Sequence, residues 1–518
     1  MNRRIMERMA RLLMLLLLVL PVLAPVQAQE RTAADKLAGL DEYINARLKE
    51  WKVPGLAIAV VQGDKVVYAQ GFGLRDVAAQ KPVTAATLFA IGSTSKAFTA
   101  TGLGMLVAEN KFEWDTPVVN LLPGFQLYDP YATAHMTPRD LVTHRSGLPR
   151  HDLMWYGSPH SRRELFTRLR HLPASRGFRS TYQYQNLMFM TAGILIEQTS
   201  GQSWEDFTRG RFFARLEMPT SNFSVNDSQR TADFALPYVE REGNVTAVPF
   251  RNIDAIGPAG SINSSVTEMA NWVIANINEG KFKGQQVIPA AALRAAHAPQ
   301  MIMPGGMQFD EISYGTYGMG WAIHTYRGNL RLSHGGGIDG FSALVSLLPR
   351  AKFGVVILTN LGGTPLPGLV ANEVYDRLLG LPAIDWNARQ KEATERGRRN
   401  AERQRAEAEK DRKNGTKPSL DLAGYAGKFE HPGYGTITIE NSGGALKIAF
   451  NSFQAALRHY HYDIFEVEEA PGVPLARRKV QFVMNDRGEV ARIEVKIETA
   501  MDALPFTRVR ERTATAGN

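Results

Sequence analysis

The 518-residue chain contains no cysteine, so it has no disulfide framework, no thiolate metal ligands and no lipid attached to a cysteine. Its eleven histidines also lack metal-ligand spacing. His135 and His144 are nine positions apart, and His459 and His461 fall on one predicted strand. We therefore expect no metal and no organic cofactor, and the stability of the fold has to come from packing.

The chain also lacks a broadly spread positive charge. Its net charge is +9, which falls to +6 without the first 28 residues. Residues 386–413 alone hold ten basic and six acidic side chains, so the rest of the chain is close to neutral. This distribution excludes a general role in nucleic-acid binding. With 44% hydrophobic residues, a chain of this length is expected to form two folded units, at least one with a large core.

Residues 1–28 are typical of an export signal peptide. Four arginines precede an apolar run over residues 12–24, and Val26-Gln27-Ala28 offers small residues for cleavage. The apolar run is much shorter than the roughly 20 residues that span a bilayer. We therefore expect an exported protein, periplasmic or secreted after cleavage near Ala28. A retained membrane anchor is the alternative.

Strand patterns lie near both ends of the region 31–384, and helical patterns lie between them. Residues 53–75 predict a hairpin, and residues 318–360 alternate between strands and turns. Residues 97–300 show helical periodicity broken by Pro and Gly loops, and residues 369–379 predict a closing helix. The pattern predicts an α+β fold, with one mixed sheet flanked by helices, a helical lobe at one side and the active site at their boundary.

Two further regions follow this domain. Residues 385–420 are rich in Arg, Glu, Lys and Ala, which predicts a charged helical linker. A basic surface for an anionic partner is the alternative. Residues 421–512 contain short alternating strands separated by Gly and Asn turns, which predict a small all-β domain, either a barrel or a sandwich. This domain is a candidate for positioning the substrate or for contact with the cell envelope.

Ser93-Thr94-Ser95-Lys96 carries the strongest chemical signal in the chain. It follows the apolar run 88–92 and begins a helix-like stretch. A serine three residues before a lysine on a helix places both side chains on one face, so an amine lies beside the hydroxyl. The pattern arises by chance about twice in a chain of this length, so it needs support from other residues.

Tyr184-Gln185-Asn186 and His334-Gly335-Gly336-Gly337 supply that support. A lysine ammonium close to a phenol favours the phenolate, so Tyr184 is a candidate for taking the proton of Ser93. Asn186 is expected to offer its amide to a substrate carbonyl and to Lys96. The glycines lie beside a predicted strand, where a substrate backbone can form main-chain hydrogen bonds. Taken alone, the tyrosine is also typical of an aromatic core, and the histidine of a turn; together the motifs predict an acyl-transfer site for a small-molecule or peptide substrate.

The order of these motifs resembles that of the class C β-lactamase and penicillin-binding-protein superfamily, in particular its branch of exported serine hydrolases, D-peptidases and esterases. The resemblance covers residues 31–384. It is reinforced by three further stretches, Val53-Pro54-Gly55, Leu141-Val142-Thr143-His144-Arg145-Ser146-Gly147-Leu148 and Ala259-Gly260-Ser261-Ile262. His144 is expected to hold a loop. The region after residue 420 resembles a β-domain that is often appended to this branch.

The resemblance implies a role for each motif residue. Ser93 becomes the acylated nucleophile, and Lys96 becomes its partner in proton transfer. Tyr184 becomes the general base and then the acid towards the leaving group, with Asn186 as a polar clamp. His334 takes the place of the Lys or His in the family's third motif. The Gly335-Gly336-Gly337 strand lines the substrate, and the backbone amides of Ser93 and Gly337 are expected to form the oxyanion hole, worth roughly 3 kcal/mol for each donor.

The third motif departs from that of the family's β-lactamases, which have Lys-Thr-Gly or Lys-Ser-Gly there to hold a substrate carboxylate. His334 is a cation only near pH 6.5 or below if its pKa is unperturbed, and Gly335 has no hydroxyl. The expected substrate is therefore an ester, an amide or a D-amino-acid peptide. A true β-lactamase or a D-alanyl-D-alanine carboxypeptidase is the alternative within the enzymes. A cell-envelope binding or sensing protein without turnover is the alternative from another class.

Overall fold

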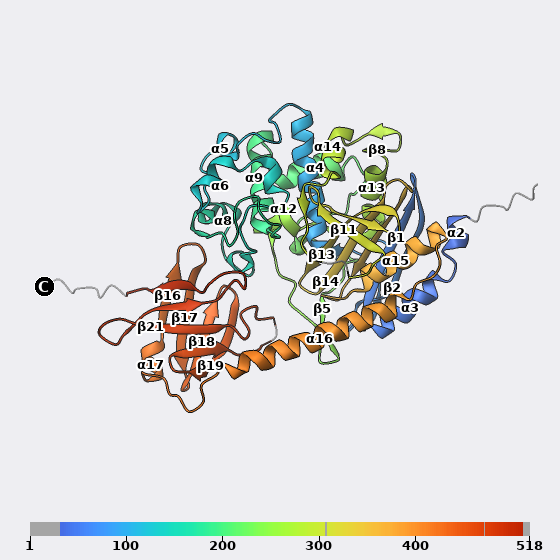
Figure 1. Cartoon of the computed structure of the whole chain (residues 1–518). Helices are drawn as coiled ribbons and strands as arrows, with labels where there is room; N and C mark the ends of the chain where they lie inside the picture. Colours follow the sequence, from blue (N-terminus) through green and yellow to red (C-terminus); the bar gives the residue numbers. More distant parts are fainter. Residues whose placement is uncertain (1–31, 306–307, 471, 511–518) are drawn as a thin grey trace, which may run out of the picture.

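The structure is a computed structural model that describes residues 32–305, 308–470 and 472–510 (Figure 1). Among them, a nine-stranded sheet forms the centre of the N-terminal domain. Its strands lie in the order β10 (Met301–Ile302), β11 (Ile312–Tyr317), β12 (Ala322–Tyr326), β13 (Asn329–Ile338), β14 (Phe341–Leu348), β15 (Phe353–Thr359), β1 (Gly55–Gln62), β2 (Lys65–Asp76) and β3 (Lys81–Pro82). The predicted α+β fold, with one sheet built from both ends of the domain, is confirmed. Only the expected mixed sheet needs correction, because all of these pairings are antiparallel and hairpins join most neighbouring strands.

The central strand β1 is apolar on both faces, because helices cover the sheet on both sides. Ala57, Ala59 and Val61 belong to the core that includes α4 (Ser95–Ala108), α9 (Asn186–Ser200) and α13 (Val266–Ile277). The alternate residues Leu56 and Ile58 face the core formed with α3 (Leu40–Glu50) and α15 (Leu366–Leu379). The sheet therefore separates the helical lobe, which carries the first two motifs, from a smaller helical layer, and the third motif lies on β13 of the sheet itself.

Short helices and strands complete this domain. The helices are α2 (Ala33–Lys36), α5 (Val118–Leu121), α6 (Pro130–His135), α7 (Pro138–Leu141), α8 (Arg162–Arg168), α10 (Trp204–Thr208), α11 (Val225–Ser228), α12 (Gly257–Gly260) and α14 (Ala290–Ala296). The strand pairs are β4 (Phe89–Ala90) with β7 (Asn263–Ser264), β5 (Tyr238–Arg241) with β6 (Asn244–Ala247), and β8 (Lys281–Phe282) with β9 (Gln285–Gln286). The β4–β7 pair joins the segment before Ser93 to the segment after α12, so it helps to fix the position of the first motif.

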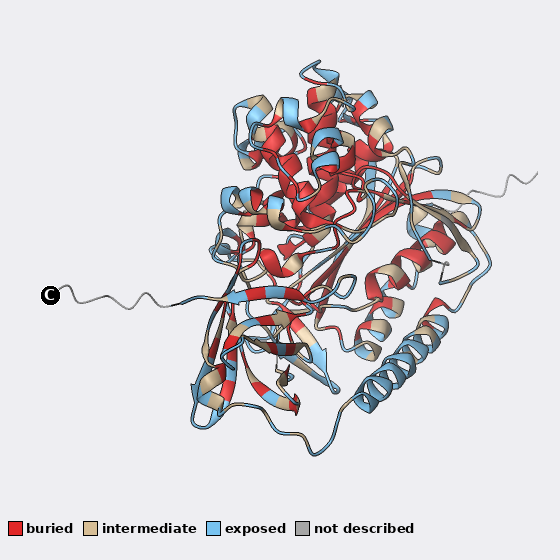
Figure 2. Cartoon of the chain, turned by 60° about the vertical axis from the view of Figure 1, so that its left-hand side comes forward, coloured by how far each residue is buried: buried red, intermediate tan, exposed pale blue. Residues whose placement is uncertain are grey.

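The charged segment between the domains forms one helix, α16 (Trp386–Lys410), which runs from the sheet domain to the C-terminal domain (Figure 1). At its first residue, the buried Trp386 donates a hydrogen bond from its indole to Asp376. Near its last turn, the Tyr460 hydroxyl donates to the carbonyl of Ala408. The helix between these anchors is mostly exposed (Figure 2).

The C-terminal domain is a closed eight-stranded barrel, which confirms the predicted all-β domain and selects the barrel. Its first and last strands pair antiparallel and close it. A short helix, α17 (Leu422–Tyr425), precedes the strands β16 (Gly427–His431), β17 (Gly435–Ser442), β18 (Ala445–Phe450), β19 (Phe453–His461), β20 (Ile464–Val467), β21 (Lys479–Met484), β22 (Val490–Val495) and β23 (Leu504–Arg508). Aromatic and aliphatic side chains of alternate positions fill the interior, as in other small barrels.

The predicted signal segment, residues 1–28, lies outside the described residues, and export stays a prediction from the sequence. In the part of the chain that the structure describes, no helix combines the length and apolar character needed to cross a membrane.

Candidate active site

Ser93 lies in the 3-10 turn Gly92–Thr94 that leads directly into α4. The backbone before it passes very close to strand β13. Gly92 has a φ of +53°, and a Cβ at this position would lie 2.8 Å from the backbone nitrogen of Gly337. Only glycine combines this conformation with this approach. The turn thus places the Ser93 hydroxyl at the boundary between the sheet and the helical lobe, where the sequence predicts the site.

Lys96 is fully buried one turn after Ser93, and its amine lies beside the serine hydroxyl as the spacing predicts. Its Nζ is 3.0 Å from Ser93 Oγ and donates a hydrogen bond of 2.7 Å to the carbonyl of Ala259. Burial, together with the positive charge of Arg150, holds the pKa of Lys96 well below its usual value. Both effects favour the neutral amine, which can accept a proton from the serine.

Tyr184 also interacts with the Ser93 hydroxyl, which acts to lower the pKa of its phenol. The centroid of its ring is 4.8 Å from the amine of Lys96. Burial raises the pKa of the Tyr184 phenol above its usual value. A lysine ammonium beside a phenolate holds the same number of protons as a neutral amine beside a phenol. A buried site disfavours the first arrangement, because it carries two charges. These pKa directions favour a proton on the phenol and the amine of Lys96 as the base beside Ser93, whereas the resemblance implies Tyr184 as the base.

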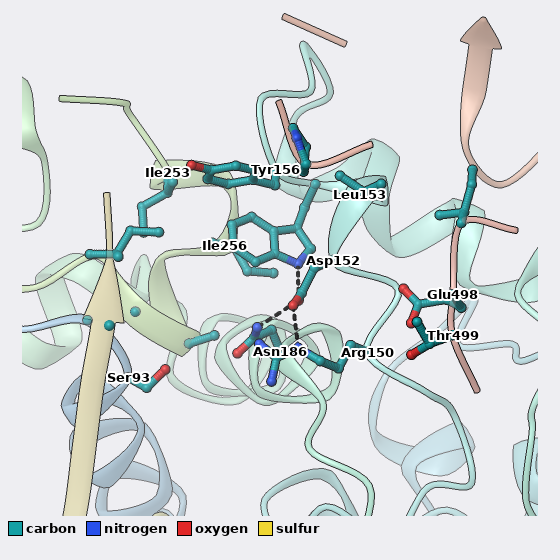
Figure 3. Close-up of a pocket in the computed structure, with 18 of the residues that line it drawn as sticks. Ser93, Arg150, Asp152, Leu153, Tyr156, Asn186, Ile253, Ile256, Glu498 and Thr499 are labelled. Atoms are coloured by element: carbon teal, nitrogen blue, oxygen red, sulfur yellow. Dashed lines mark hydrogen bonds and ion pairs between the residues drawn. The ribbon is translucent and has the colours of Figure 1, made fainter. Parts of the chain in front are cut away.

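Asn186 begins α9 and lines the same cavity, but its amide has a partner that the sequence did not suggest. Its Nδ2 donates a 2.9 Å hydrogen bond to Asp152, and no hydrogen bond joins it to Lys96 among the described residues. The Asp152 carboxylate also pairs with Arg150 at 2.5 Å and accepts a hydrogen bond from the indole of Trp155 at 3.0 Å (Figure 3). Asp152 therefore orients the side-chain amide of Asn186. The side-chain oxygen of Asn186 remains available to other groups.

His334 is buried on β13, and its side chain is held by two neighbours. Its Nδ1 lies 2.7 Å from the carbonyl of Gly335, which can only accept, so Nδ1 carries the hydrogen. Its Nε2 then accepts a 3.0 Å hydrogen bond from the hydroxyl of Tyr317. Burial and the nearby Lys96 lower the pKa of His334 to about 3. The titration expected near pH 6.5 is therefore corrected: His334 is neutral at physiological pH and supplies no cation to the site.

The three glycines after His334 differ in what surrounds them. β12 pairs with β13 only as far as Ser333, so the edge of β13 beyond that residue is left unpaired on the side of Ser93. The two-residue turn after Ile338 makes Ile338 and Phe341 a hydrogen-bonded pair, so Gly337 and Gly335 direct their N–H and C=O groups away from β14. The Gly337 N–H therefore faces the serine turn, as the expected oxyanion hole requires.

Gly336 fixes the distance between β13 and the serine turn. A Cβ on Gly336 would overlap the carbonyl of Ile91, whereas a Cβ on Gly337 would meet no atom within 4 Å. The first glycine is therefore needed for close packing, and the second faces the open cavity.

His144 packs against the segment that carries Tyr184. Its Nδ1 accepts a 3.0 Å hydrogen bond from the backbone of Gln185, and its ring centroid lies 4.2 Å from that of Tyr184. The expected structural role agrees with these contacts.

A cavity of about 420 Å³ opens in front of Ser93, and both domains line it (Figure 3). Gly92, Ser93, Asn186 and Gly337 form one end. The barrel contributes the residues Pro474, Arg478, Ile497, Glu498 and Thr499. The volume lies in the range of pockets that bind small molecules. Among the described residues, no group of three or more histidine, aspartate or glutamate side chains is arranged to hold a metal ion.

The sequence motifs missed Arg150, Asp152, Tyr317 and the barrel residues. Arg150 and Asp152 follow the stretch 141–148 almost immediately, so a closer look at the end of that stretch could have found them. No local pattern marks Arg478 or Glu498, because they reach the cavity only through the packing of two domains.

Comparisons with known proteins agree with this division of the chain. Residues 40–379 match the Beta-lactamase family, and residues 411–508 match the Domain of unknown function DUF3471. The unguisins hydrolase ungD' of Aspergillus campestris is 31% identical to this chain, over 77% of the chain and 76% of its own length. The unguisins hydrolase ungD of Aspergillus violaceofuscus is 32% identical, over 76% of the chain and 74% of its own length.

Solved structures show the same fold at lower identity. The octameric penicillin-binding protein homologue from Pyrococcus abyssi is 21% identical, with a TM-score of 0.59 over 91% of this chain and 100% of its own. A structure of SurE with D-Leu is 18% identical, with a TM-score of 0.52 over 92% of this chain and 100% of its own. The family match over residues 40–379 and the relatives above 30% identity establish that this chain belongs to the beta-lactamase family of serine hydrolases and carries a C-terminal DUF3471 domain.

Proposed function

We propose that this protein hydrolyses the amide bond of a peptide-like substrate, and related esters, through an acyl-enzyme on Ser93. The observation that carries the proposal is the contact of one serine hydroxyl with both a buried amine, at 3.0 Å, and a phenol. A nucleophile that contacts both a base and an acid has the two proton-transfer partners that acyl transfer requires.

The first half of the reaction forms the acyl-enzyme. Ser93 Oγ bonds to the substrate carbonyl carbon while its proton passes to the neutral amine of Lys96. The carbonyl oxygen takes the negative charge, towards the backbone N–H groups of Ser93 and Gly337. The bond to the leaving nitrogen or oxygen then breaks. Tyr184 gives its proton to the leaving group and recovers one from Lys96, so the site returns to its starting proton count.

The second half releases the acid. Water attacks the acyl carbon in place of the leaving group and gives its proton to the amine of Lys96. The ester bond to Ser93 breaks, Oγ takes the proton of Tyr184, and Tyr184 recovers one from Lys96. Over one cycle the leaving group takes away one proton, and the proton from water restores the serine hydroxyl.

The unpaired edge of β13 supports a peptide-like substrate. An extended backbone placed beside Gly335 and Gly337 can exchange main-chain hydrogen bonds with them, as an added strand does. A neutral His334 offers nothing to a penicillin carboxylate, which counts against a β-lactamase. The relatives named as unguisins hydrolases, and the fold neighbour solved with D-Leu, motivate amides and D-amino-acid compounds as test substrates.

The test combines labelling of the serine with a substrate panel. We expect a fluorophosphonate probe to label the wild type and not Ser93→Ala, while Ser442→Ala, at an exposed serine of β17, labels normally. The panel holds D-amino-acid amides, p-nitrophenyl esters, a D-Ala-D-Ala peptide and nitrocefin. Labelling of Ser93→Ala would overturn the proposal. Efficient turnover of nitrocefin or of the D-Ala-D-Ala peptide alone would select the family's other activities, and an acyl-Ser93 that never hydrolyses would select a binding protein.

A further inference from the structure

The barrel is bonded to the loop that carries Arg150 and Asp152. At the turn between β18 and β19, the side-chain amide of Asn451 donates to the carbonyl of Leu153 at 2.8 Å and to that of Tyr156 at 3.1 Å. The backbone N–H of Ser452 donates to the carbonyl of Gly157 at 3.0 Å. These bonds join backbone groups of the loop to one hairpin tip, so the barrel and the loop have a defined relative position.

Aromatic contacts tighten the same interface. The rings of Phe453 and Tyr156 stack with their centroids 5.5 Å apart. Gly157 has a φ of +65°, and a Cβ there would lie 2.7 Å from the Phe453 ring, so the loop requires a glycine where the barrel meets it. The hydroxyl of Tyr434 lies 2.6 Å from Nδ1 of the buried His151. The barrel therefore packs on the loop in a specific way.

This docking brings two barrel loops to the cavity. The connection between β20 and β21 supplies Pro474 and Arg478, and the connection between β22 and β23 supplies Ile497, Glu498 and Thr499. Figure 3 shows Ser93 on one side of the cavity, Glu498 and Thr499 on the other, and Arg150 with Asn186 between them. The cavity thus has a serine end, made by the family motifs, and a barrel end, which those motifs do not include.

The charged groups of the cavity differ in whether they have partners. Arg150 is paired with Asp152, and the backbone N–H of His151 donates to the carboxylate of Glu498. Arg478 is half-buried in the cavity wall. Across the described residues, its guanidinium forms neither a hydrogen bond nor an ion pair, although it lies within electrostatic range of Glu498. An arginine held in a cavity with its donors unused is suited to an anionic ligand.

We propose that Arg478 is a specificity-determining residue that binds a carboxylate of the substrate at the barrel end of the cavity while the scissile carbonyl lies at Ser93. The planar guanidinium matches the two oxygens of a carboxylate in a bidentate pair. The usual family position for a cation is occupied by the neutral His334, so the barrel supplies the charge from a different direction. This inference rests on the proposed function for the reaction at Ser93 and adds the class of substrate.

The chain offers a matched control at the neighbouring position. Arg477 is exposed, lies 3.7 Å from Glu469 and does not line the cavity, so Arg477→Met removes the same charge from the same loop.

Two pairs of substrates locate the carboxylate. A p-nitrophenyl monoester of a dicarboxylic acid and its terminal amide place it on the acyl side. An acetylated D-dipeptide with a free or an amidated C-terminus places it on the leaving side.

We expect the wild type to prefer the free acid in one of the pairs by at least tenfold in kcat/KM. Arg478→Met should lose about tenfold or more on that acid and less than twofold on the matching amide, Arg478→Lys should retain part of the preference, and Arg477→Met should behave as the wild type. No preference for either acid, or equal effects of the two methionine variants, would overturn the inference. Fluorophosphonate labelling of Ser93 and turnover of the neutral partners report the proposed function separately, and unchanged thermal unfolding shows that the variants are folded.

Discussion

The two ends of the cavity are built on different principles. At the serine end, burial holds the pKa of Lys96 well below its usual value and lowers that of His334 to about 3, so the site favours the neutral form of both side chains. At the barrel end, Glu498 has a pKa raised to about 7 by burial and by Asp152, and Arg478 forms no ion pair with any residue that the structure describes. One end is a neutral, closely packed reaction centre, and the other is a charged surface from a second domain.

The difference indicates which property each end sets. A serine, an amine and a phenol need fixed distances and little water, and glycines at positions 92 and 336 give them that through close backbone contact. Recognition of a substrate needs groups that can be varied without disturbing this centre. Loops of a separate barrel meet that need, because their residues line the cavity but take no part in the close contacts of Gly92 and Gly336.

Removing the base of the serine end has the largest expected effect. Lys96→Met keeps an unbranched chain in the buried site but cannot accept the proton of Ser93. We expect kcat/KM to fall by about 10³-fold or more for every substrate, since general-base catalysis contributes roughly 10² to 10⁴ and the half-buried hydroxyl of Ser93 loses a partner as well. Lys111→Met, at an exposed lysine, is the control. A variant that keeps a tenth of the wild-type acylation rate in stopped-flow measurements would assign the base to another group.

The close approach of β13 to the serine turn gives the next largest effect. Gly336→Ala places a methyl group against the carbonyl of Ile91, so β13 must shift away from Ser93. We expect a loss of about 1–3 kcal/mol in the free energy of unfolding, the usual cost of overpacking, and a fall in activity of about 10²-fold. Denaturant unfolding and fluorophosphonate labelling measure the two effects.

Gly337→Ala is the matched comparison on the same strand. Its methyl group meets no atom within 4 Å, so stability should be unchanged. If both variants lose the same stability, the argument from close packing is wrong.

The contrast between the two ends also explains which features of the fold and the site could be predicted from the sequence. The hairpin over 53–75, the strands over 318–360 and the barrel were predictable because their alternating side chains are set by short-range rules. Ser93, Lys96 and Tyr184 were predictable because their motifs carry their own spacing. The proton on Tyr184 and the neutral state of His334 were not, since the burial that shifts their pKa values comes from residues far away in the chain. The roles of Arg478 and Glu498 were not predictable either. Only the docking of Asn451 and Phe453 on the loop 150–157 brings these two residues to the cavity.

Weakening that docking should affect the barrel end alone. Asn451 has a φ of +53°, so Asn451→Gly removes the amide and keeps the backbone conformation. Two hydrogen bonds to the loop are lost, and each contributes roughly 1 kcal/mol. We expect KM for the carboxylate substrate to rise about threefold to tenfold, and p-nitrophenyl acetate to be hydrolysed as before. Asn441→Ala, at an exposed residue of β17, is the control. An equal loss on acetate would mean that the barrel supports the serine end as well.

The smallest effect is the pH dependence at Glu498, and its sign is set by the charges around it. Glu498 faces Arg150 and Asp152 of the loop, Arg478 of the barrel and the backbone N–H of His151. Its carboxyl, with a pKa near 7, is neutral below that pH and negative above it, where it competes with a substrate carboxylate for Arg478. We therefore expect KM for the carboxylate substrate, divided by KM for its amide, to rise about threefold between pH 6 and pH 8, because one charge at this range in a partly solvated site shifts binding only modestly. Glu498→Gln should make this ratio independent of pH. Titrations at the serine end affect both substrates equally, so they cancel in the ratio of the two KM values. If the ratio still depends on pH in Glu498→Gln, the titrating group is not Glu498, and Glu498 has no role in binding the substrate carboxylate.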